Sequence, residues 1–367
     1  MARYPSLSAA GDQVPASIFA RLREHLARFP GDVIPLQIGD THLGPPVTLD
    51  AVSWHEPADL YAYGAPGGWQ PLIDALAARH HAHVQIAVGA THALSCAVQA
   101  VCDPGDELIL LSPHWPLIRG IALGHRVVPV EVELAALEAA ITPRTAAIYL
   151  ASPNNPDGAM LAHGELAAIA ELAERRGLWI LSDEVYEHYV YDAAHVAMLS
   201  IARARPRTIT VHSFAKSFAQ AGLRVGYAIT AEPRLTDTLR KLVNHSVYNV
   251  PVAMQRAALA ALAAGDAFLP AAVARYRGAR DRARERLTAP AARPPGGAYL
   301  WVDFRRWSGD DCLPVLERVA ASGVLLAPGS AFGDAYGGFA RLCFTGVDEA
   351  RLDEGIDRIN AVLAAWP

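Results

Sequence analysis

The 367-residue sequence predicts an α/β fold in which helices cover a mostly parallel sheet, followed by a smaller second layer. From about residue 69 onwards, short apolar runs typical of strands alternate with longer amphipathic segments typical of helices. The hydrophobic content of 52% and the charged content of 19% indicate a globular protein with a large interior. A chain of this length is expected to form one large domain plus a smaller one.

Within the predicted large domain, apolar runs of strand length alternate with segments of helical period. We expect helices over 68–81, 91–102 and 165–177. Strands are expected over 83–88, 106–112, 125–133, 145–152, 177–184, 207–213 and 223–230. The segment 88–90 reads as a turn before the second helix. Strands separated by helices indicate a sheet that is covered on both faces.

The chain changes character after about residue 250. A helix that opens with Pro251 and a separate Arg-rich helix are expected over 251–266 and 268–288. After a Pro-Gly break, the smaller layer is completed by a strand, a helix, two short strands and a final helix, with the longer elements at 298–304, 311–323 and 348–366. The expected division is an N-terminal segment that packs with the small domain, a large domain and a small C-terminal domain: 1–40, 41–266 and 267–367.

Charge and hydropathy exclude some partners. The formal net charge of −5 and the lack of a long basic run argue against a nucleic-acid partner. Charges, Gly or Pro interrupt the apolar stretches before the roughly 20 residues of a membrane span, and residues 1–15 have no signal-peptide core, so a cytoplasmic protein is expected. The cysteines have no metal-ligand spacing; they read as buried free thiols, and no metal is expected: Cys96, Cys102, Cys312 and Cys343.

Polar motifs directly follow four of the expected strands. They are GATHAL (89–94), SPNNPDG (152–158), SDEVYEHY (182–189) and HSFAKS (212–217). Each has a simpler reading when taken alone, since SPNNPDG is a turn sequence, SDE fits a helix N-cap and most lysines lie on the surface. Those readings do not explain why an amide, an acid, a lysine and an arginine follow successive strands. Ligands of open α/β sheets bind at the carboxyl ends of strands, so a ligand site is predicted there.

The lysine of the last motif, Lys216, is one of only two lysines among 32 basic residues. The motifs around it are PNNPDG (153–158), DEVY (183–186), S-x-x-K (213–216) and AGLRVGY (221–227), in this order. In this combination the chain resembles the class I/II, aspartate-aminotransferase-like family of pyridoxal-phosphate (PLP) enzymes of fold type I, from about Ile34 to Arg341. The resemblance implies a large domain with a mostly parallel seven-stranded sheet between helices, plus a smaller α+β domain from the N- and C-terminal segments.

The resemblance also implies PLP as the cofactor and assigns the catalytic groups. Lys216 would form a Schiff base with the cofactor aldehyde, which a primary amine can do and a guanidinium cannot. It would then move the proton at the substrate α-carbon. Asp183 would keep the pyridine nitrogen protonated, so that the ring withdraws electrons. Asn155 and Tyr186 would hydrogen-bond the phenolic oxygen of the cofactor.

The phosphate and the ring face of the cofactor receive implied partners as well. Arg224 would pair with the phosphate through its guanidinium, and Ser213 would add a hydroxyl. The backbone amides of Ala90 and Thr91, at a helix start, would meet the same phosphate. Trp115 would stack on the ring, the alternative being an ordinary core or surface tryptophan.

Two implied contacts involve a second subunit and the substrate. Tyr63 would reach the phosphate of the partner subunit, with Tyr61 as the competing choice, so that the site is complete only in a homodimer. Arg341 would bind the substrate α-carboxylate, with Gly39 and Asn155 beside it. Without such a role, Arg341 would form an ion pair at a strand edge.

The chain departs from the family pattern at the substrate entrance, where it has Asp40, Thr41 and His42. Asp157 stands in place of the usual threonine of PNNPTG and is expected to act as a local cap. Five histidines near the motifs are expected to be structural rather than catalytic: His42, His92, His114, His188 and His245.

The leading prediction is an aminotransferase that exchanges the amino group between an L-amino acid and a 2-oxo acid. The same cofactor chemistry also supports a lyase or a decarboxylase, and AGLRVGY also fits a histidinol-phosphate-type aminotransferase. A non-catalytic PLP-binding regulator domain is disfavoured, because no DNA-binding pattern is found before residue 30. Trp115, Tyr248 and Phe332 are expected to line an apolar pocket, which favours aromatic or aliphatic amino acids.

Overall fold

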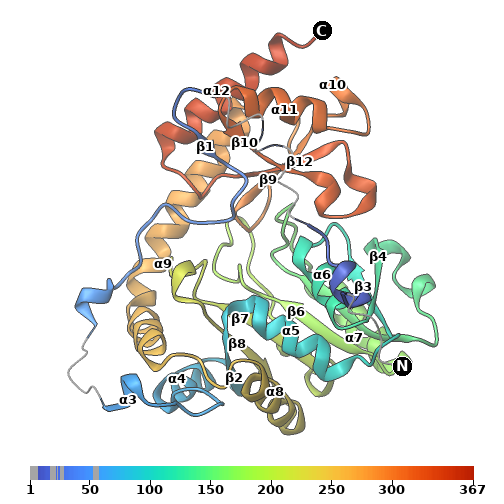
Figure 1. Ribbon diagram of the computed structural model, residues 1–367, viewed down its shortest axis with the longest axis vertical. Helices are drawn as coiled ribbons and strands as arrows, with labels where there is room; N and C mark the ends of the chain where they lie inside the picture. Colours follow the sequence, from blue (N-terminus) through green and yellow to red (C-terminus); the bar gives the residue numbers. More distant parts are fainter. Residues whose placement is uncertain (1–6, 17–21, 23, 25–28, 53–57) are drawn as a thin grey trace.

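The computed structural model describes residues 7–16, 22, 24, 29–52 and 58–367 and has two lobes (Figure 1). The lower lobe in Figure 1 contains a seven-stranded sheet of order β2-β8-β7-β6-β5-β3-β4. Its strands are β2 (His83–Val88), β3 (Glu107–Leu111), β4 (Val128–Val132), β5 (Thr145–Ala151), β6 (Trp179–Asp183), β7 (Thr208–Ser213) and β8 (Val225–Thr230). Only β8 runs antiparallel to its neighbours, so the predicted mostly parallel sheet is confirmed.

Helices cover both faces of this sheet. In β5, Tyr149 belongs to a core that includes residues of α5, α6 and α8, whereas Ile148 and Leu150 belong to a core with α7. The covering helices are α4 (Gln70–His80), α5 (Gly89–Val101), α6 (Pro116–Gly124), α7 (His163–Arg176) and α8 (Pro233–Ser246). Strands buried on both faces need apolar residues at successive positions, which explains the continuous apolar runs in the sequence.

The upper lobe combines the C-terminal part of the chain with a segment from near the N-terminus (Figure 1). It contains an antiparallel sheet of order β11-β12-β9 and a parallel pair, β1 with β10. The bounds are β1 (Ile34–Pro35), β9 (Tyr299–Asp303), β10 (Val324–Leu325), β11 (Ala327–Pro328), β12 (Phe339–Cys343), α11 (Leu313–Ala321) and α12 (Glu349–Ala364). The smaller α+β layer built from both ends of the chain is therefore confirmed.

Short elements complete the fold. The described short α-helices are α1 (Ala9–Asp12), α3 (Ala58–Tyr61) and α10 (Arg305–Ser308). Single turns of 3-10 helix lie at Leu49–Ala51, Leu134–Ala136, Glu138–Ala140, Met198–Ser200, Arg205–Arg207, Ala221–Leu223, Gly329–Ala331 and Asp334–Tyr336. The expected turn at 88–90 is not separate from α5, because the helix already begins at Gly89.

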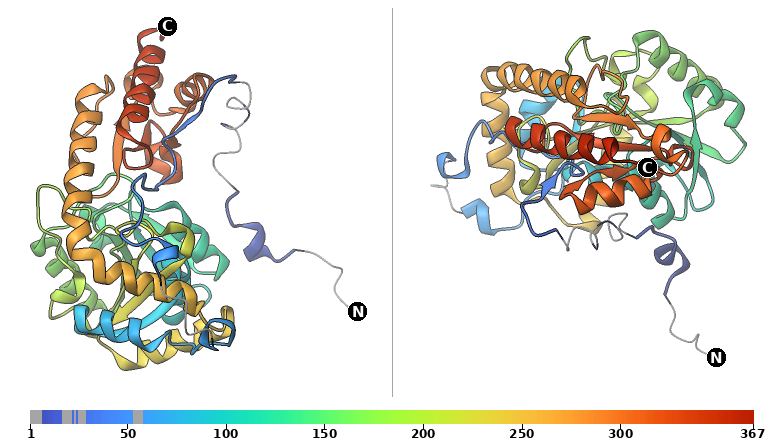
Figure 2. Two further views of the ribbon diagram at one scale, coloured as in Figure 1. Left: turned by 90° about the vertical axis from the view of Figure 1, so that its left-hand side faces the viewer. Right: turned by 90° about the horizontal axis from the view of Figure 1, so that it is seen from above.

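A single 35-residue helix, α9 (Val252–Arg286), runs from the lower lobe into the upper lobe (Figures 1 and 2). The prediction of two separate helices is wrong, because α9 continues through Pro270. Proline has no backbone N–H, so one hydrogen bond of the helix is missing at Pro270. The burial of Leu269 and Ala272 on either side of it indicates that packing keeps the helix intact there. The expected domain boundary between 266 and 267 falls inside α9. By length and composition α9 is the described helix that could cross a membrane, but here it packs against α4 and α12.

Arg280 of α9 is fully buried and connects three segments of the chain. Its guanidinium forms ion pairs with Asp192 and Asp281 and donates a hydrogen bond to the carbonyl oxygen of Pro294 at 2.8 Å. The same group lies over the ring of Tyr191 at 4.8 Å. These contacts attach α9 to the segment that follows β6 and to the segment that follows α9.

We expect Arg280→Ala to lower the free energy of unfolding by about 2–4 kcal/mol, because it removes charged hydrogen bonds and leaves a cavity. Chemical denaturation followed by circular dichroism measures the change. The control is Arg282→Ala, two positions along the same helix, whose exposed ion pair with Asp353 adds little stability. Equal losses in the two variants would contradict the role assigned to Arg280.

Candidate active site

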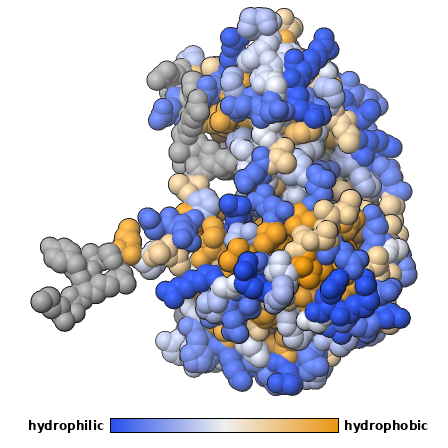
Figure 3. Space-filling view, turned by 90° about the vertical axis from the view of Figure 1, so that its right-hand side faces the viewer, coloured by the Kyte–Doolittle hydropathy of each residue, from blue (hydrophilic) through white to orange (hydrophobic). Residues whose placement is uncertain are grey.

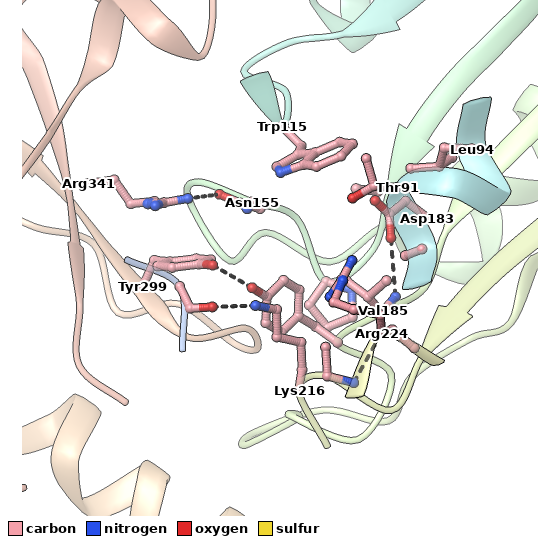
Figure 4. A pocket seen from close by; sticks show the side chains of 17 residues that line it. Thr91, Leu94, Trp115, Asn155, Asp183, Val185, Lys216, Arg224, Tyr299 and Arg341 are labelled. Atoms are coloured by element: carbon pink, nitrogen blue, oxygen red, sulfur yellow. Dashed lines mark hydrogen bonds between the residues drawn. The ribbon is translucent and has the colours of Figure 1, made fainter. Parts of the chain in front are cut away.

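The predicted site residues meet around one cavity of about 200 Å³ between the lobes, at the carboxyl ends of β5, β6 and β7 (Figure 4). The lining includes eleven of the twelve predicted site residues: Gly39, Ala90, Thr91, Trp115, Asn155, Asp183, Tyr186, Ser213, Lys216, Arg224 and Arg341. The other lining residues are Leu94, Ala151, Pro153, Val185, Ala215 and Tyr299. Tyr63 does not line the cavity.

Lys216 follows β7, and its side chain reaches across the cavity to the N-terminal segment (Figure 4). Its amine donates a hydrogen bond to the carbonyl oxygen of Gly39, and its own carbonyl accepts one from the hydroxyl of Tyr189 at 2.6 Å. Burial lowers the pKa of the Lys216 ammonium; Cys343 and Asp40 oppose this shift, and the charges of Arg341 and Arg224 add to it. Burial therefore makes the neutral, nucleophilic form of the amine more accessible than it is in water.

Asp183 ends β6 and is buried among neutral partners. Its Oδ2 accepts a hydrogen bond from the hydroxyl of Tyr149 at 3.0 Å, and its Oδ1 accepts one from the backbone N–H of Val185 at 3.2 Å. Burial raises the pKa of Asp183 to about 6 against these hydrogen bonds. A buried carboxylate in this position is best stabilised by a cationic group in the cavity.

The start of α5 and the side chain of Arg224 form an anion-binding corner. The helix begins at Gly89, so the first backbone amides of α5, including those of Ala90 and Thr91, have no acceptor in the preceding turn. A Cβ on Gly89 would lie 2.3 Å from the Arg224 guanidinium, and one on Gly226 would lie 2.6 Å from the backbone nitrogen of Ala90. The two glycines let a guanidinium and a helix N-terminus approach each other, although both are positive. An anion between them offsets this repulsion.

Arg341 lies in β12 with its guanidinium between two rings. It donates hydrogen bonds to Asn155 Oδ1 at 2.7 Å and to the carbonyl oxygen of Gln37 at 2.6 Å. The guanidinium carbon lies 4.2 Å from the ring centroid of Tyr299 and 4.9 Å from that of Phe332. Its buried Nε has no hydrogen-bond partner, and no ion pair joins it to a carboxylate of the described residues. The alternative of a strand-edge ion pair is therefore wrong.

Tyr299 is the polar lining residue that the sequence analysis missed. Its hydroxyl hydrogen-bonds that of Tyr186, and a Cβ on Gly39 would lie 1.9 Å from it. Tyr299 begins β9, where an apolar strand pattern made it look like an ordinary core residue. The Pro-Gly break before Tyr299 could have indicated its role, because binding and catalytic residues often lie on or next to loops.

The remaining predicted residues lie outside the cavity. Tyr63 and Tyr61 are 84% and 91% exposed, and the ring of Tyr63 packs on that of Tyr248 with centroids 4.7 Å apart. The expectation that Tyr248 and Phe332 line the pocket is wrong, because neither residue belongs to its lining; Phe332 is buried and packs against the Arg341 guanidinium. None of the five histidines near the motifs lines the cavity. Asp157 does act locally, because its Oδ1 accepts hydrogen bonds from the backbone of Ala159 and the side chain of Asn154.

The fold and the lysine, acid and arginines that line its cavity define an enzyme of the aminotransferase type. The family model of class I and II aminotransferases matches residues 31–359. An aspartate/prephenate aminotransferase of Thermus thermophilus is 34% identical over 327 residues, covering 82% of this chain and 83% of the relative. An arginine–pyruvate transaminase of Pseudomonas aeruginosa is 37% identical over 277 residues, covering 71% and 69%.

Solved structures agree with these relatives. The aspartate aminotransferase of Thermus thermophilus with maleate has a TM-score of 0.90 and 30% identity, covering 98% of this chain and 100% of that one. The N-succinyldiaminopimelate aminotransferase of Mycobacterium tuberculosis has a TM-score of 0.89 and 29% identity, covering 97% and 100%. The chain belongs to the class I and II aminotransferase family and is an aminotransferase.

We expect Gly226→Ala to weaken binding of added PLP by about ten- to a hundredfold, because the new methyl group would displace the start of α5. Fluorescence titration of cofactor-free protein with PLP measures this affinity. The control is Gly222→Ala, where a Cβ would meet no atom within 4 Å. An unchanged affinity in Gly226→Ala would contradict the anion-binding corner.

Proposed function

We propose that this aminotransferase is PLP-dependent and exchanges the amino group between an L-amino acid and a 2-oxo acid, with Lys216 as the residue that binds the cofactor covalently. The supporting observation is that the Lys216 amine shares one cavity with Arg341, whose guanidinium forms no ion pair with a carboxylate of the described residues. A buried primary amine suits covalent binding of an aldehyde, and an unpaired guanidinium suits a substrate carboxylate.

Three features of the cavity fit PLP. The corner between α5 and Arg224 suits a phosphate, since two positive groups approach each other there. The buried Asp183, which accepts hydrogen bonds from the neutral Tyr149 hydroxyl and Val185 backbone, suits the protonated ring nitrogen. Trp115 lines the same cavity and offers an aromatic face for the ring (Figure 4).

PLP, when bound, supplies an aldehyde that accepts amino groups and a ring that withdraws electrons. Lys216 Nζ would hold the cofactor at rest and then carry the proton at the substrate α-carbon, a task for which its lowered pKa is suited. Asp183 would hold the proton on the ring nitrogen. Tyr186 would donate its hydrogen bond to the phenolic oxygen, and Arg341 would orient the substrate through its α-carboxylate.

The lining residues favour an uncharged substrate side chain. Beyond the three groups already assigned, Lys216, Arg224 and Arg341, the described residues place no further cation in the lining. Trp115, Leu94 and Val185 present apolar surface instead. We therefore propose an aromatic or aliphatic amino donor, although relatives of this chain are named for aspartate, prephenate and arginine.

A homodimer and a cytoplasmic location complete the proposal. Tyr63 is exposed on the lower lobe, where it is free to reach a second copy of the chain. A separate apolar area lies on the side of the lower lobe that faces away from α3 (Figures 1 and 3), and such areas are typical of interfaces. In the dimer, Tyr63 would reach the partner's phosphate.

We expect Lys216→Ala to abolish the half-reaction in which an amino acid converts bound PLP to its amine form, because no covalent amine remains. The change in cofactor absorbance on adding the amino acid measures it, and borohydride reduction tests for the covalent bond. Lys241→Ala, which changes the exposed lysine of α8, is the matched control and should react normally. Release of ammonia or carbon dioxide by the unaltered protein would favour a lyase or decarboxylase instead.

We expect hybrid dimers to reveal whether Tyr63 acts across the interface. If it does, a hybrid dimer of one Lys216→Ala chain and one Tyr63→Ala chain contains one intact site. That site combines the unaltered Lys216 of one chain with the unaltered Tyr63 of the other, so mixing the two variants should restore activity. Activity of refolded mixtures, with light scattering to confirm dimers, measures the restoration. Hybrids with Tyr61→Ala test the competing tyrosine. A fully active monomer would contradict the arrangement.

A further inference from the structure

Three titratable side chains lie behind the segment that carries Lys216, outside the cavity. Glu187 and His188 directly follow Tyr186, and His212 lies near the end of β7. Their side chains are 16%, 17% and 3% exposed, respectively. We call Glu187, His188 and His212 the acid–histidine cluster.

Glu187 contacts both histidines of the cluster. Its Oε1 accepts a hydrogen bond from His212 Nδ1 at 3.0 Å and lies 3.7 Å from His188 Nδ1. His212 is also fixed from its other sides, because its Nε2 lies 3.1 Å from Thr210 Oγ1 and its ring stacks on Tyr227 with centroids 5.2 Å apart. The carboxylate of Glu187 thus has a partner whose orientation is set independently.

His188 extends the cluster to the residue that follows the lysine. A guanidinium nitrogen of Arg79 donates a hydrogen bond to His188 Nε2 at 2.8 Å, so Nε2 is the acceptor and the ring proton lies on Nδ1. This Nδ1 is 3.1 Å from Ser217 Oγ and can donate to it. Burial lowers the pKa of His188, which favours the neutral ring that this arrangement needs.

A third bond completes a pattern. Tyr189 donates a hydrogen bond to the carbonyl oxygen of Lys216 at 2.6 Å. Three consecutive residues after Tyr186 therefore contact the β7 end and the lysine segment, through His212, Ser217 and Lys216. The loop that carries Tyr186 and the segment that carries Lys216 are joined behind the cavity.

We propose that Glu187 is a positioning residue, which fixes the hydroxyl of Tyr186 relative to the amine of Lys216 through its contacts with His212 and His188. The inference rests on the proposed function, in which both groups act on one cofactor. A displacement of about 1 Å between reacting groups can lower a rate a hundredfold, so a contact that keeps them in place affects turnover.

The charges of the cluster make this positioning sensitive to pH. Burial alone would lower the pKa of His212, but the charge and hydrogen bond of Glu187 outweigh burial and raise it. The neighbouring ring of His80 is not a competing cation, because burial lowers the pKa of His80 to about 4. The groups in contact with His212 are Thr210 of β7, Tyr227 of β8 and His80 of α4. Three carboxylates at or after the end of β6 act on its charge: Asp183, Glu184 and Glu187. The charge of Arg79 acts on the neighbouring His80.

The sign of the pH effect follows from the raised pKa. The charged form of His212 is fully present below the ordinary histidine pKa of about 6.5 and is lost as the pH rises through the higher value of the folded protein. The ion pair with Glu187 therefore contributes most at the acidic end of the working range and less at alkaline pH.

The test compares Glu187→Gln and Glu187→Ala with His195→Gln in the PLP-loaded enzyme. Gln keeps the shape and an acceptor for His212 but removes the charge, so it also serves if Ala fails to fold. His195 forms an ion pair of the same kind with Glu184 at 2.9 Å but, within the part of the chain that the structure describes, makes no hydrogen bond to the lysine segment, which makes it the matched control. The measurements are kcat and KM from about pH 6 to about pH 10, the absorbance of bound PLP over the same range, and thermal stability.

We expect Glu187→Ala to lower kcat by about ten- to a hundredfold with little change in KM, and to shift the pH at which the PLP absorbance changes. Glu187→Gln should lose less, and its deficit should shrink as the pH rises, because His212 then loses its charge in the unaltered enzyme too. His195→Gln should keep both kcat and the absorbance titration. Loss of thermal stability alone, with kcat and the titration unchanged in both Glu187 variants, would overturn the inference. If the unaltered protein showed no PLP absorbance, the proposed function would fail instead.

Discussion

The active site depends on two cations that donate hydrogen bonds to the same short segment of the chain. The amine of Lys216 donates to the carbonyl of Gly39, and the guanidinium of Arg341 donates to that of Gln37. Within the described part of the chain, no carboxylate forms an ion pair with either of them. Carbonyl oxygens balance a positive charge less well than a carboxylate does. The cavity therefore favours anionic ligands, such as those with phosphate or carboxylate groups.

The sheet explains how the other groups come to face these cations. β5, β6 and β7 are neighbours and run parallel, so the residues that follow them lie at one edge: Asn155, Asp183 and Lys216. The upper lobe adds Arg341 from β12, and the β1–β10 pair holds the segment that contains Gly39. The site is thus shared by two lobes, and α9, which runs through both, links them.

Local patterns predicted much of this arrangement, and long-range contacts account for what they missed. Strands of the large sheet are apolar at successive positions, so their existence and the motifs after them were readable. The continuity of α9 through Pro270 depends on burial by distant elements, which no local rule contains. Tyr299 lies at the cavity because β9 pairs with β12, the strand that carries Arg341. The contact between Glu187 and His212 likewise requires the fold, since their spacing in sequence signals nothing.

Lysine is scarce in this chain, and arginine and lysine serve two different purposes in it. Arginine forms ion pairs such as those of the buried Arg280, because a guanidinium keeps its proton even when buried. An ammonium responds differently: burial lowers the pKa of Lys216 and makes the neutral, nucleophilic amine accessible. Burying an amine with only a carbonyl partner works against stability, so the contacts behind it, from Tyr189 and through His188, must hold its segment in place. Burial thus disfavours the charged form of Lys216 and, for the same reason, favours the neutral form that can act as a nucleophile.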